Sequence, residues 1–143
     1  MILYVDTSAL VKLYATEPGS MQTRRTVSRA DEVASSLLAY VETRAAFARK
    51  KRMHQLSDTE LERAKRAFEL DWGGFVKMPA NVEMVNRAAD LAEQFQLRAY
   101  DALHLATADR LSRETGSPVS FLGFDAALND AAAKLGLTVV VAS

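Results

Sequence analysis

Short segments with the length and composition of buried strands alternate along this chain with longer segments of helical periodicity. Helices that cover both faces of a parallel sheet give its strands this buried character, and alternation of strand and helix is typical of parallel α/β folds. The chain is therefore predicted to be an α/β protein with a five-stranded parallel sheet. The predicted strands are residues 2–5, 32–36, 75–79, 119–124 and 137–142.

Helices are predicted between these strands. A capping box, formed by Ser57 and Glu60, marks the start of one of them. The expected ranges are 7–17, 19–30, 37–53, 57–72, 81–96, 99–116 and 125–136. Over 37–53, the periodicity predicts that one apolar face is buried, made of Leu37, Leu38, Val41, Ala45 and Ala48.

Length and composition exclude several classes of protein. The 143 residues suggest a single domain, 1–143. The absence of cysteine excludes disulfides and thiolate metal sites, and no apolar run is long enough to span a membrane. Lys+Arg and Asp+Glu are equal at 18 each, so any nucleic-acid affinity must come from a local patch. We therefore expect a cytoplasmic protein with no membrane contact.

Two acids directly follow predicted strands. Asp6 comes after the first strand and Asp125 after the fourth. Ligands of open parallel sheets bind beyond the carboxyl ends of the strands, so both acids are candidates for a shared site. Aspartate is also a favoured N-cap, and either residue could simply cap the helix that follows it.

Two further acids lie on or beside apolar helix faces. Asp101 falls inside the apolar sector of its helix, whereas Asp109 lies near the border and is predicted to be solvated. A carboxylate on an apolar face is costly unless it is paired or metal-bound, which leaves a structural pair with Arg98 or a metal site. Glu42 lies at the edge of its helix's apolar face. Four converging carboxylates would raise one another's pKa values, and a hard cation such as Mg²⁺ or Mn²⁺ would remove that penalty.

The segments "YVDTSALVKLY", "VETRAAF", "YDALHLATA" and "FLGFDAALNDAA" resemble those of PIN domains, specifically VapC-type toxin ribonucleases. The resemblance covers nearly the whole chain. It implies a three-layer α/β/α sandwich with strand order 3-2-1-4-5 and Mg²⁺- or Mn²⁺-dependent endonucleolytic cleavage of RNA. It also implies a cognate VapB-type antitoxin and, at family level, a homodimer.

The acids of the family pattern correspond to Asp6, Glu42, Asp101 and Asp125. We assign Asp6 and Asp101 as the main metal ligands and Asp125 as a ligand directly or through water. Glu42 would orient or deprotonate the attacking water or hold a second metal. The hydroxyl residues that follow the first acid in the family correspond to Thr7 and Ser8, which are candidate substrate contacts. Many relatives carry Ser or Thr two residues before the last acid, where this chain has Gly123.

Residues 44–52 carry five cations and no acid. Arg49, Lys50 and Lys51 could contact RNA phosphates, or they could be a solvated helix end, where cations are favoured. A non-catalytic PIN-like binding module is the alternative to the nuclease. A phosphatase with an aspartyl nucleophile is disfavoured because Ser8 stands where such enzymes typically have a second acid, and a receiver domain is disfavoured because its paired acids are missing.

Four other side chains receive structural interpretations. Tyr40 and Phe47 could meet a partner helix, but packing near Phe68 and Trp72 is the preferred interpretation. His104, on the apolar face of its helix, is predicted to be a core residue. His54, beside the basic run, is predicted to be exposed.

Overall fold

The computed structural model describes residues 1–140, and within them the strands form one parallel sheet. The order is β3-β2-β1-β4-β5, so the predicted fold class and strand order are confirmed. The fifth predicted strand reached residue 142, and its last two residues lie outside the described range. The strands are β1 (Ile2–Val5), β2 (Glu32–Ser36), β3 (Val76–Met78), β4 (Val119–Leu122) and β5 (Thr138–Val139).

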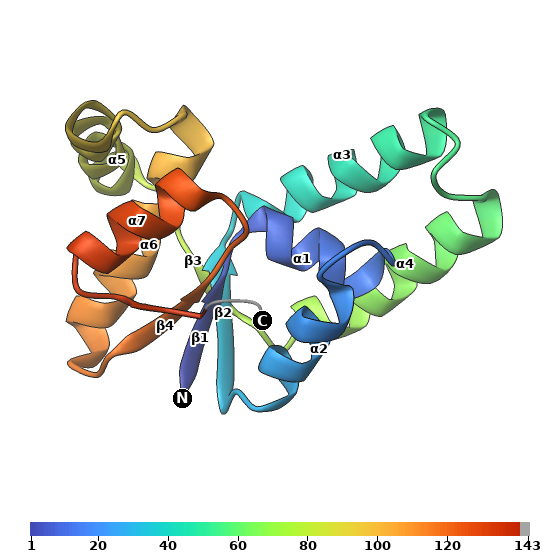
Figure 1. Cartoon of the computed structure of the whole chain (residues 1–143), viewed down its shortest axis with the longest axis horizontal. Helices are drawn as coiled ribbons and strands as arrows, with labels where there is room; N and C mark the ends of the chain where they lie inside the picture. The colour runs from blue at the N-terminus through green and yellow to red at the C-terminus, as the bar shows by residue number, and fades with distance from the viewer. Residues whose placement is uncertain (141–143) are drawn as a thin grey trace.

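Helices cover both faces of this sheet (Figure 1). They are α1 (Thr7–Tyr14), α2 (Ser20–Ser28), α3 (Ala39–Arg52), α4 (Asp58–Trp72), α5 (Val82–Phe95), α6 (Ala99–Thr115) and α7 (Ala126–Lys134). Helices α1 to α4 lie on one side, where α3 and α4 project beyond the sheet, and α5 to α7 lie on the other. Among residues 1–140, no helix combines the length and apolarity needed to cross a membrane.

The alternation of side chains along β1 gives each layer its own core. Successive strand residues point to opposite faces. Tyr4 therefore belongs to the cluster beneath α5, α6 and α7, whereas Leu3 and Val5 belong to the cluster beneath α1, α3 and α4. All three side chains are fully or almost fully buried, so β1 is the centre of the molecule.

The predicted buried face of α3 is wrong. Leu37 and Val41 are 50% and 60% exposed, and Ala45 is exposed too, while Leu38 and Ala48 are only half-buried. The helix instead buries Ala39, Thr43 and Phe47.

Aromatic packing against α4 decides which face of α3 is buried. Phe47 meets Phe68 edge-on at 6.0 Å between ring centroids, and Tyr40 stacks on Phe68 at 5.6 Å and lies 5.6 Å from Trp72. Aromatic rings bury more apolar area than the aliphatic side chains on the opposite face. The packing interpretation of Tyr40 and Phe47 is confirmed.

Asp109 is not solvated, and that prediction is also wrong. Asp109 is only 8% exposed, and its carboxylate accepts hydrogen bonds from Arg113, one turn later on α6. Arg87 of α5 lies 3.9 Å from the same oxygen. The helices α5 and α6 pack together and cover this border of α6, so a cation from each compensates the burial.

Candidate active site

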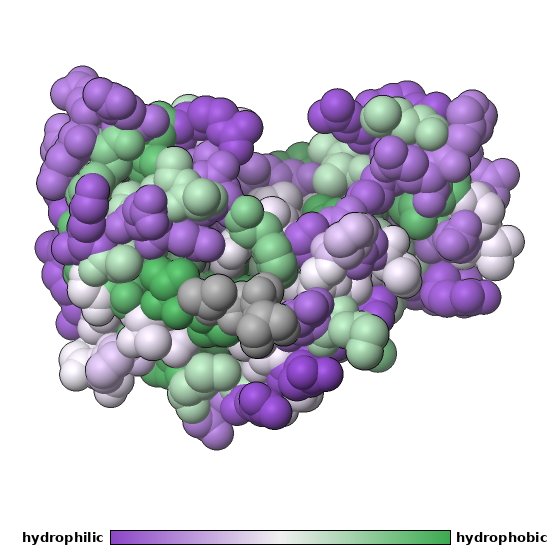
Figure 2. All heavy atoms as spheres, viewed as in Figure 1, coloured by the Kyte–Doolittle hydropathy of each residue, from purple (hydrophilic) through white to green (hydrophobic). Residues whose placement is uncertain are grey.

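The ends of β1 and β4 bring two of the predicted acids to one edge of the sheet. Val5 pairs with Leu122 in the parallel register, and the backbone N–H of Asp6 donates to the carbonyl of Leu122 at 3.2 Å. Asp6 is the N-cap of α1, and Asp125 is the N-cap of α7. In Figure 1 this edge lies in the upper part of the view, and in Figure 2 the outline of the molecule dips there between the two helical layers.

Asp6 caps α1 and is buried at the same time. One carboxylate oxygen, Oδ1, accepts the backbone N–H of Ala9 at 3.0 Å and the hydroxyl of Ser8 at 2.6 Å. The residue is only 4% exposed. The capping interpretation is therefore confirmed, and it uses Oδ1 while the other oxygen, Oδ2, faces Gly123.

Gly123 leaves room for this carboxylate. A Cβ atom at position 123 would lie 2.7 Å from Oδ2 of Asp6, a distance at which something must shift. A Ser or Thr at this position would therefore push against Asp6. With Asp6 placed as it is, position 123 has no room for the Ser or Thr that many relatives carry.

Burial raises the pKa of the Asp6 carboxyl above its ordinary value of 3.8. Water cannot solvate the charged form there, and the negative charge of Asp101 adds to the shift. The hydrogen bonds from Ser8 and Ala9 oppose it in part, and so does the charge of His104 whenever its ring is protonated. The ionised acid is therefore costly in the isolated chain, and a cation that reaches it would be stabilised.

Glu42 lies in the first turn of α3 and is held from two other elements. The Thr7 hydroxyl donates to its Oε1 at 2.9 Å, and Nε2 of His104 lies 3.2 Å from the same oxygen. His104 is buried, as predicted. The contact of His104 with an acid was not predicted, although His104 follows Asp101 by three residues on α6, a spacing that places both on one helix side.

Asp101 and Asp125 share one cation, Arg98. Its Nε donates to Asp101 Oδ2 at 3.0 Å, and its Nη2 lies 3.6 Å from Asp125 Oδ2. Asp125 also caps α7 by accepting the N–H of Leu128 at 2.9 Å. The suspected pair of Asp101 with Arg98 is present, and it includes a second acid from another element. The Arg98 side chain is 81% exposed.

These contacts hold the four acids in two groups, Asp6 with Glu42 and Asp101 with Asp125, and they do not form a closed metal cage. Within residues 1–140, no three His, Cys, Asp or Glu side chains are arranged so that they could hold a metal ion as they stand. Their chemistry nevertheless fits Mg²⁺ or Mn²⁺, since carboxylate oxygens are the ligands that hard cations prefer. At position 123 the glycine places no side chain against Oδ2 of Asp6. Asp6, Glu42, Asp101 and Asp125 remain a predicted site on this geometry.

The two hydroxyl residues predicted to contact substrate each hold an acid. Ser8 donates its hydroxyl hydrogen to Asp6, and its oxygen accepts the N–H of Phe124 at 3.3 Å. Thr7 donates to Glu42. Each hydroxyl has a single hydrogen, so in this arrangement Thr7 and Ser8 could meet a substrate only as acceptors.

The basic residues lie at the other end of α3. Lys50 follows Glu42 by eight residues, which is about 12 Å along a helix axis. Lys50 pairs with Glu17 at 2.5 Å and Lys51 with Asp58 at 2.6 Å. Arg49 is exposed. The structure therefore does not bring these cations to the acids, and a role in RNA binding would have to act at the far end of the helix, where α3 turns toward α4 (Figure 1). His54, in that turn, is exposed as predicted.

Comparison with known proteins places the chain in a family. The PIN domain family matches residues 3–135. Ribonuclease VapC45 from Mycobacterium tuberculosis is 42% identical over 109 residues, which cover 75% of this chain and 74% of that protein.

Solved structures agree with the fold. The crystal structure of VapC20, a sarcin-ricin loop cleaving toxin from Mycobacterium tuberculosis, has a TM-score of 0.67 at 17% identity and covers 90% of this chain and 94% of that one. A chain of a toxin-antitoxin complex from Klebsiella pneumoniae has a TM-score of 0.54 at 18% identity, covering 82% and 83%. The length of the family match, the identity to a curated relative and the strand order together show that the chain belongs to the PIN domain family, among the VapC ribonucleases.

Proposed function

We propose that this chain is an endoribonuclease that requires Mg²⁺ or Mn²⁺ and acts as the toxin of a toxin–antitoxin pair. The observation that supports the proposal is a pair of hydrogen-bonded groups beyond the ends of β1 and β4. Thr7, Ser8 and His104 hold Asp6 and Glu42, and Arg98 holds Asp101 and Asp125. The family pattern has an acid at each of these four positions, which supports their assignment to one site. The relative named Ribonuclease VapC45 supports the nuclease activity.

In this proposal Asp6 and Asp101 hold the cation, and Asp125 joins them directly or through water. When bound, the cation supplies a water of lowered pKa and neutralises charge on the scissile phosphate. Glu42 orients this water or accepts its proton, since Thr7 already holds one of its oxygens in place. No nucleophilic side chain of the protein is needed, because water attacks the phosphorus directly.

A binding module that only docks a partner is the second candidate. The ion pairs that Arg98 makes with Asp101 and Asp125 favour it, because they would also stabilise acids that never bind a metal. The two candidates differ in what a divalent cation does to the protein. A nuclease is stabilised by Mg²⁺ and cleaves RNA, whereas a docking module shows neither response.

The test is cleavage of labelled RNA by the purified chain with Mg²⁺, with Mn²⁺ and with excess chelator. We expect cleavage only with the cations, and we expect Asp101→Asn to reduce it below detection. Asp130→Asn is the matched control, because Asp130 is an exposed acid on α7 away from the four-acid edge. Cleavage by Asp101→Asn at the rate of Asp130→Asn would reject the assignment, and so would unchanged cleavage in chelator.

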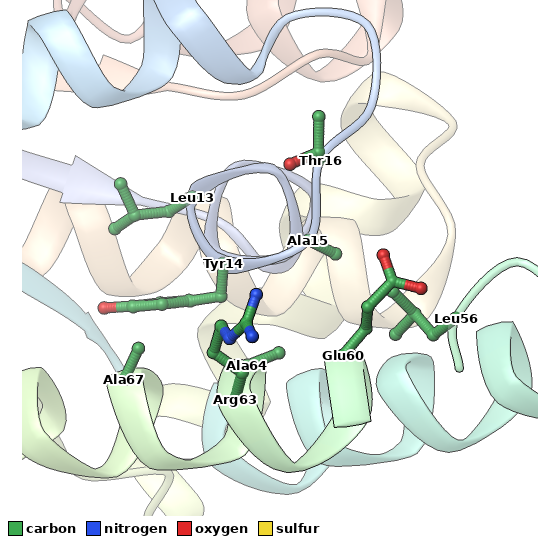
Figure 3. A pocket seen from close by; sticks show the side chains of 9 residues that line it. All are labelled: Leu13, Tyr14, Ala15, Thr16, Leu56, Glu60, Arg63, Ala64 and Ala67. Atoms are coloured by element: carbon green, nitrogen blue, oxygen red, sulfur yellow. The ribbon is translucent and has the colours of Figure 1, made fainter. Parts of the chain in front are cut away.

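We also propose an antitoxin as the regulatory partner, which would restrain a ribonuclease acting on RNA in the cytoplasm. The pocket of about 240 Å³ between α1 and α4 is a candidate surface for it (Figure 3). Leu13, Leu56 and Ala64 line it with apolar atoms, and Glu60 and Arg63 add charge at its border. Co-expression with a VapB-type protein should protect cells and yield a stable complex. Ala67, which also lines the pocket, is exposed, so Ala67→Glu should weaken that complex without reducing cleavage.

A homodimer is part of the same proposal. Large apolar side chains are exposed on α3, α5 and α6, among them Val41 at 60%, Val85 at 50% and Tyr100 at 58%. Exposed apolar groups of this size are typical of contact surfaces. Light scattering at several protein concentrations should give twice the mass of 15.7 kDa, and Val85→Glu should shift the equilibrium toward the monomer.

A further inference from the structure

A buried polar chain runs from the central strand to Glu42. The Tyr4 hydroxyl, at the centre of the sheet, lies 2.7 Å from Nδ1 of His104. On the other side of the imidazole ring, Nε2 lies 3.2 Å from Oε1 of Glu42 and 3.1 Å from the Thr7 hydroxyl. Tyr4 is 0% and His104 3% exposed. Burying these groups is costly unless each hydrogen bond is made, so the direction of each bond can be derived.

The phenol of Tyr4 is the donor at one end. A phenol carries its hydrogen at neutral pH, and within residues 1–140 its hydrogen-bond partner is Nδ1 of His104 at 2.7 Å, so the hydroxyl donates there. At the other end stands the Glu42 carboxylate, which can only accept. A bare Nε2 lone pair facing that carboxylate would be repulsive. The arrangement is satisfied when Tyr4 donates to Nδ1, and the ring hydrogen is on Nε2 and points to Glu42 and Thr7.

We propose that Tyr4 and His104 are positioning residues that fix Glu42 for the reaction. The proposal rests on the function proposed above, in which Glu42 handles the attacking water. Nε2–H of His104 and the hydroxyl of Thr7 both donate to Oε1. Oε2 accepts no hydrogen bond from residues 1–140 and is therefore the oxygen left for the water.

The support is rigid because its base is the sheet. The Tyr4 ring stacks on Phe121 of the neighbouring strand, with centroids 5.8 Å apart and an angle of 9° between the planes. His104 meets the Tyr4 ring edge-on at 5.8 Å. Neither ring can turn without disturbing the core, so the position of Nε2 is set by packed strands and a helix. The Thr7 hydroxyl, by comparison, can rotate, and alone it would hold Glu42 less precisely.

Nuclear magnetic resonance tests the hydrogen-bond direction without any cleavage assay. The chain has two histidines, so ¹⁵N-labelled histidine gives two ring systems, with exposed His54 as the internal reference. In the metal-free protein at mildly alkaline pH we expect His104 as a single neutral tautomer with the hydrogen on Nε2. Tyr4→Phe should change the Nδ1 shift of His104 and leave His54 unchanged. A ring protonated on Nδ1, alone or together with Nε2, would overturn the donor chain.

Two variants of His104 then test what the chain does for Glu42. The Gln amide can reach toward Glu42 and donate, whereas Leu has a similar size and no donor. For His104→Leu we expect kcat to fall about 10- to 100-fold, as for lost orienting partners of functional ligands, with KM changed less than about twofold. We expect His104→Gln to recover most of that loss. Tyr4→Phe, which keeps the stacked ring, should lower kcat about three- to tenfold.

Each outcome separates this inference from the proposed function. If no RNA is cleaved under any condition, the function fails while the histidine spectra still decide the donor chain. If wild type cleaves and His104→Leu, shown to be folded, has the same kcat, the positioning role is overturned. A folded His104→Gln as slow as His104→Leu would also overturn it, since a donor would then not be what matters. If His104→Leu fails to fold, Tyr4→Phe decides, and an unchanged kcat in it counts against the role.

Discussion

The two halves of the acidic edge are stabilised in different ways. Asp6 and Glu42, the inner pair, lie among hydroxyls, a backbone N–H and an imidazole, and no Lys or Arg of residues 1–140 pairs with them. Asp101 and Asp125, the outer pair, share the exposed guanidinium of Arg98. The inner pair is held by short neutral groups fixed in the core, and the outer pair by a long charged side chain at the surface.

The difference follows from burial. A neutral donor can be buried at modest cost once its hydrogen bond is made, whereas a buried cation needs full compensation. Near the surface an ion pair is tolerated, but it contributes only about 0–1 kcal/mol. The inner pair is therefore fixed in position, while the cation on the outer pair can be displaced. An edge with one rigid and one exchangeable half is suited to receiving a divalent ion.

Replacing Asp6 should give the largest effect and the clearest difference between the inner and the outer pair. Because the folded-state pKa of Asp6 is raised above 3.8, the folded protein binds more protons than the unfolded chain between the two values. Its stability therefore falls as pH rises through that interval. Asp6→Asn should abolish cleavage and yet raise the melting temperature of the metal-free protein at neutral pH. About 1 kcal/mol corresponds to roughly 4 °C in a domain of this size.

The control for this prediction is Asp125→Asn, measured by calorimetry with and without Mg²⁺. Asp125 is more exposed, and Asn can cap α7 equally well, so the metal-free melting temperature should barely change. The gain in Asp6→Asn should shrink as pH is lowered, and its stabilisation by Mg²⁺ should be reduced. A lower melting temperature for Asp6→Asn at neutral pH would show that ionised Asp6 does not destabilise the folded protein.

Gly123→Ala should disturb the inner pair and leave the outer pair in place. The added Cβ would lie 2.7 Å from Oδ2 of Asp6, and overpacking of this kind costs about 1–3 kcal/mol. We expect lower stability in urea and slower cleavage. Gly73→Ala is the matched control, because the nearest atom to its new Cβ would be 3.9 Å away. Equal stabilities of the two variants would mean that Asp6 moves freely and is not held as described.

Arg98→Gln should release the outer pair with a smaller effect. Because Arg98 competes with a cation for Asp101 and Asp125, the variant should bind Mg²⁺ up to about fivefold more tightly, the equivalent of about 1 kcal/mol. Titration calorimetry with Mg²⁺ measures this. Arg110→Gln removes another surface cation of α6, which pairs with Glu83 and Glu114, and should not change the affinity. Weaker Mg²⁺ binding by Arg98→Gln would show that Arg98 supports the site instead of competing for it.

The smallest effect is expected far from both pairs, at the basic end of α3. Lys51 is the more accessible lysine there, with a side chain 47% exposed against 20% for Lys50. If it contacts a phosphate, Lys51→Gln should weaken RNA binding a few-fold for any sequence and lower the salt slope by about 1. Binding measured at several salt concentrations would show this, with Lys65→Gln on α4 as the control. An identical slope for wild type and both variants would show that Lys51 makes no phosphate contact.

Local sequence patterns predicted most of the secondary structure. The strand 2–5, the capping box at Ser57 and the end of α6 at Gly116 all depend on neighbouring residues, and the structure has them where they were expected. The parallel order followed from the family resemblance. The acids after β1 and β4 could be placed at one edge because parallel strands end together.

The predictions that failed required knowledge of partners distant in the chain. Leu37 and Val41 are as apolar as residues of a buried helix face, but the aromatic rings of α4 pack against Phe47 on another face of α3. Asp109 was expected in solvent because its helix alone cannot show that α5 covers it. In each case, a contact between separate elements decided which of two acceptable faces was buried.

The sequence by itself thus determined the alternation of strands and helices and the caps, because each depends on residues close together in the chain. It also predicted the four acids, from their places after strands and on helix faces and from the family resemblance. Only the tertiary structure decided that His104 reaches Glu42 from Tyr4, that Arg98 joins two acids, and that Gly123 makes room for Asp6. These contacts join residues from different elements, and burial gives them their energetic weight. No pattern within one helix or strand contains that information, since it arises only when the sheet and its two helical layers close around one another.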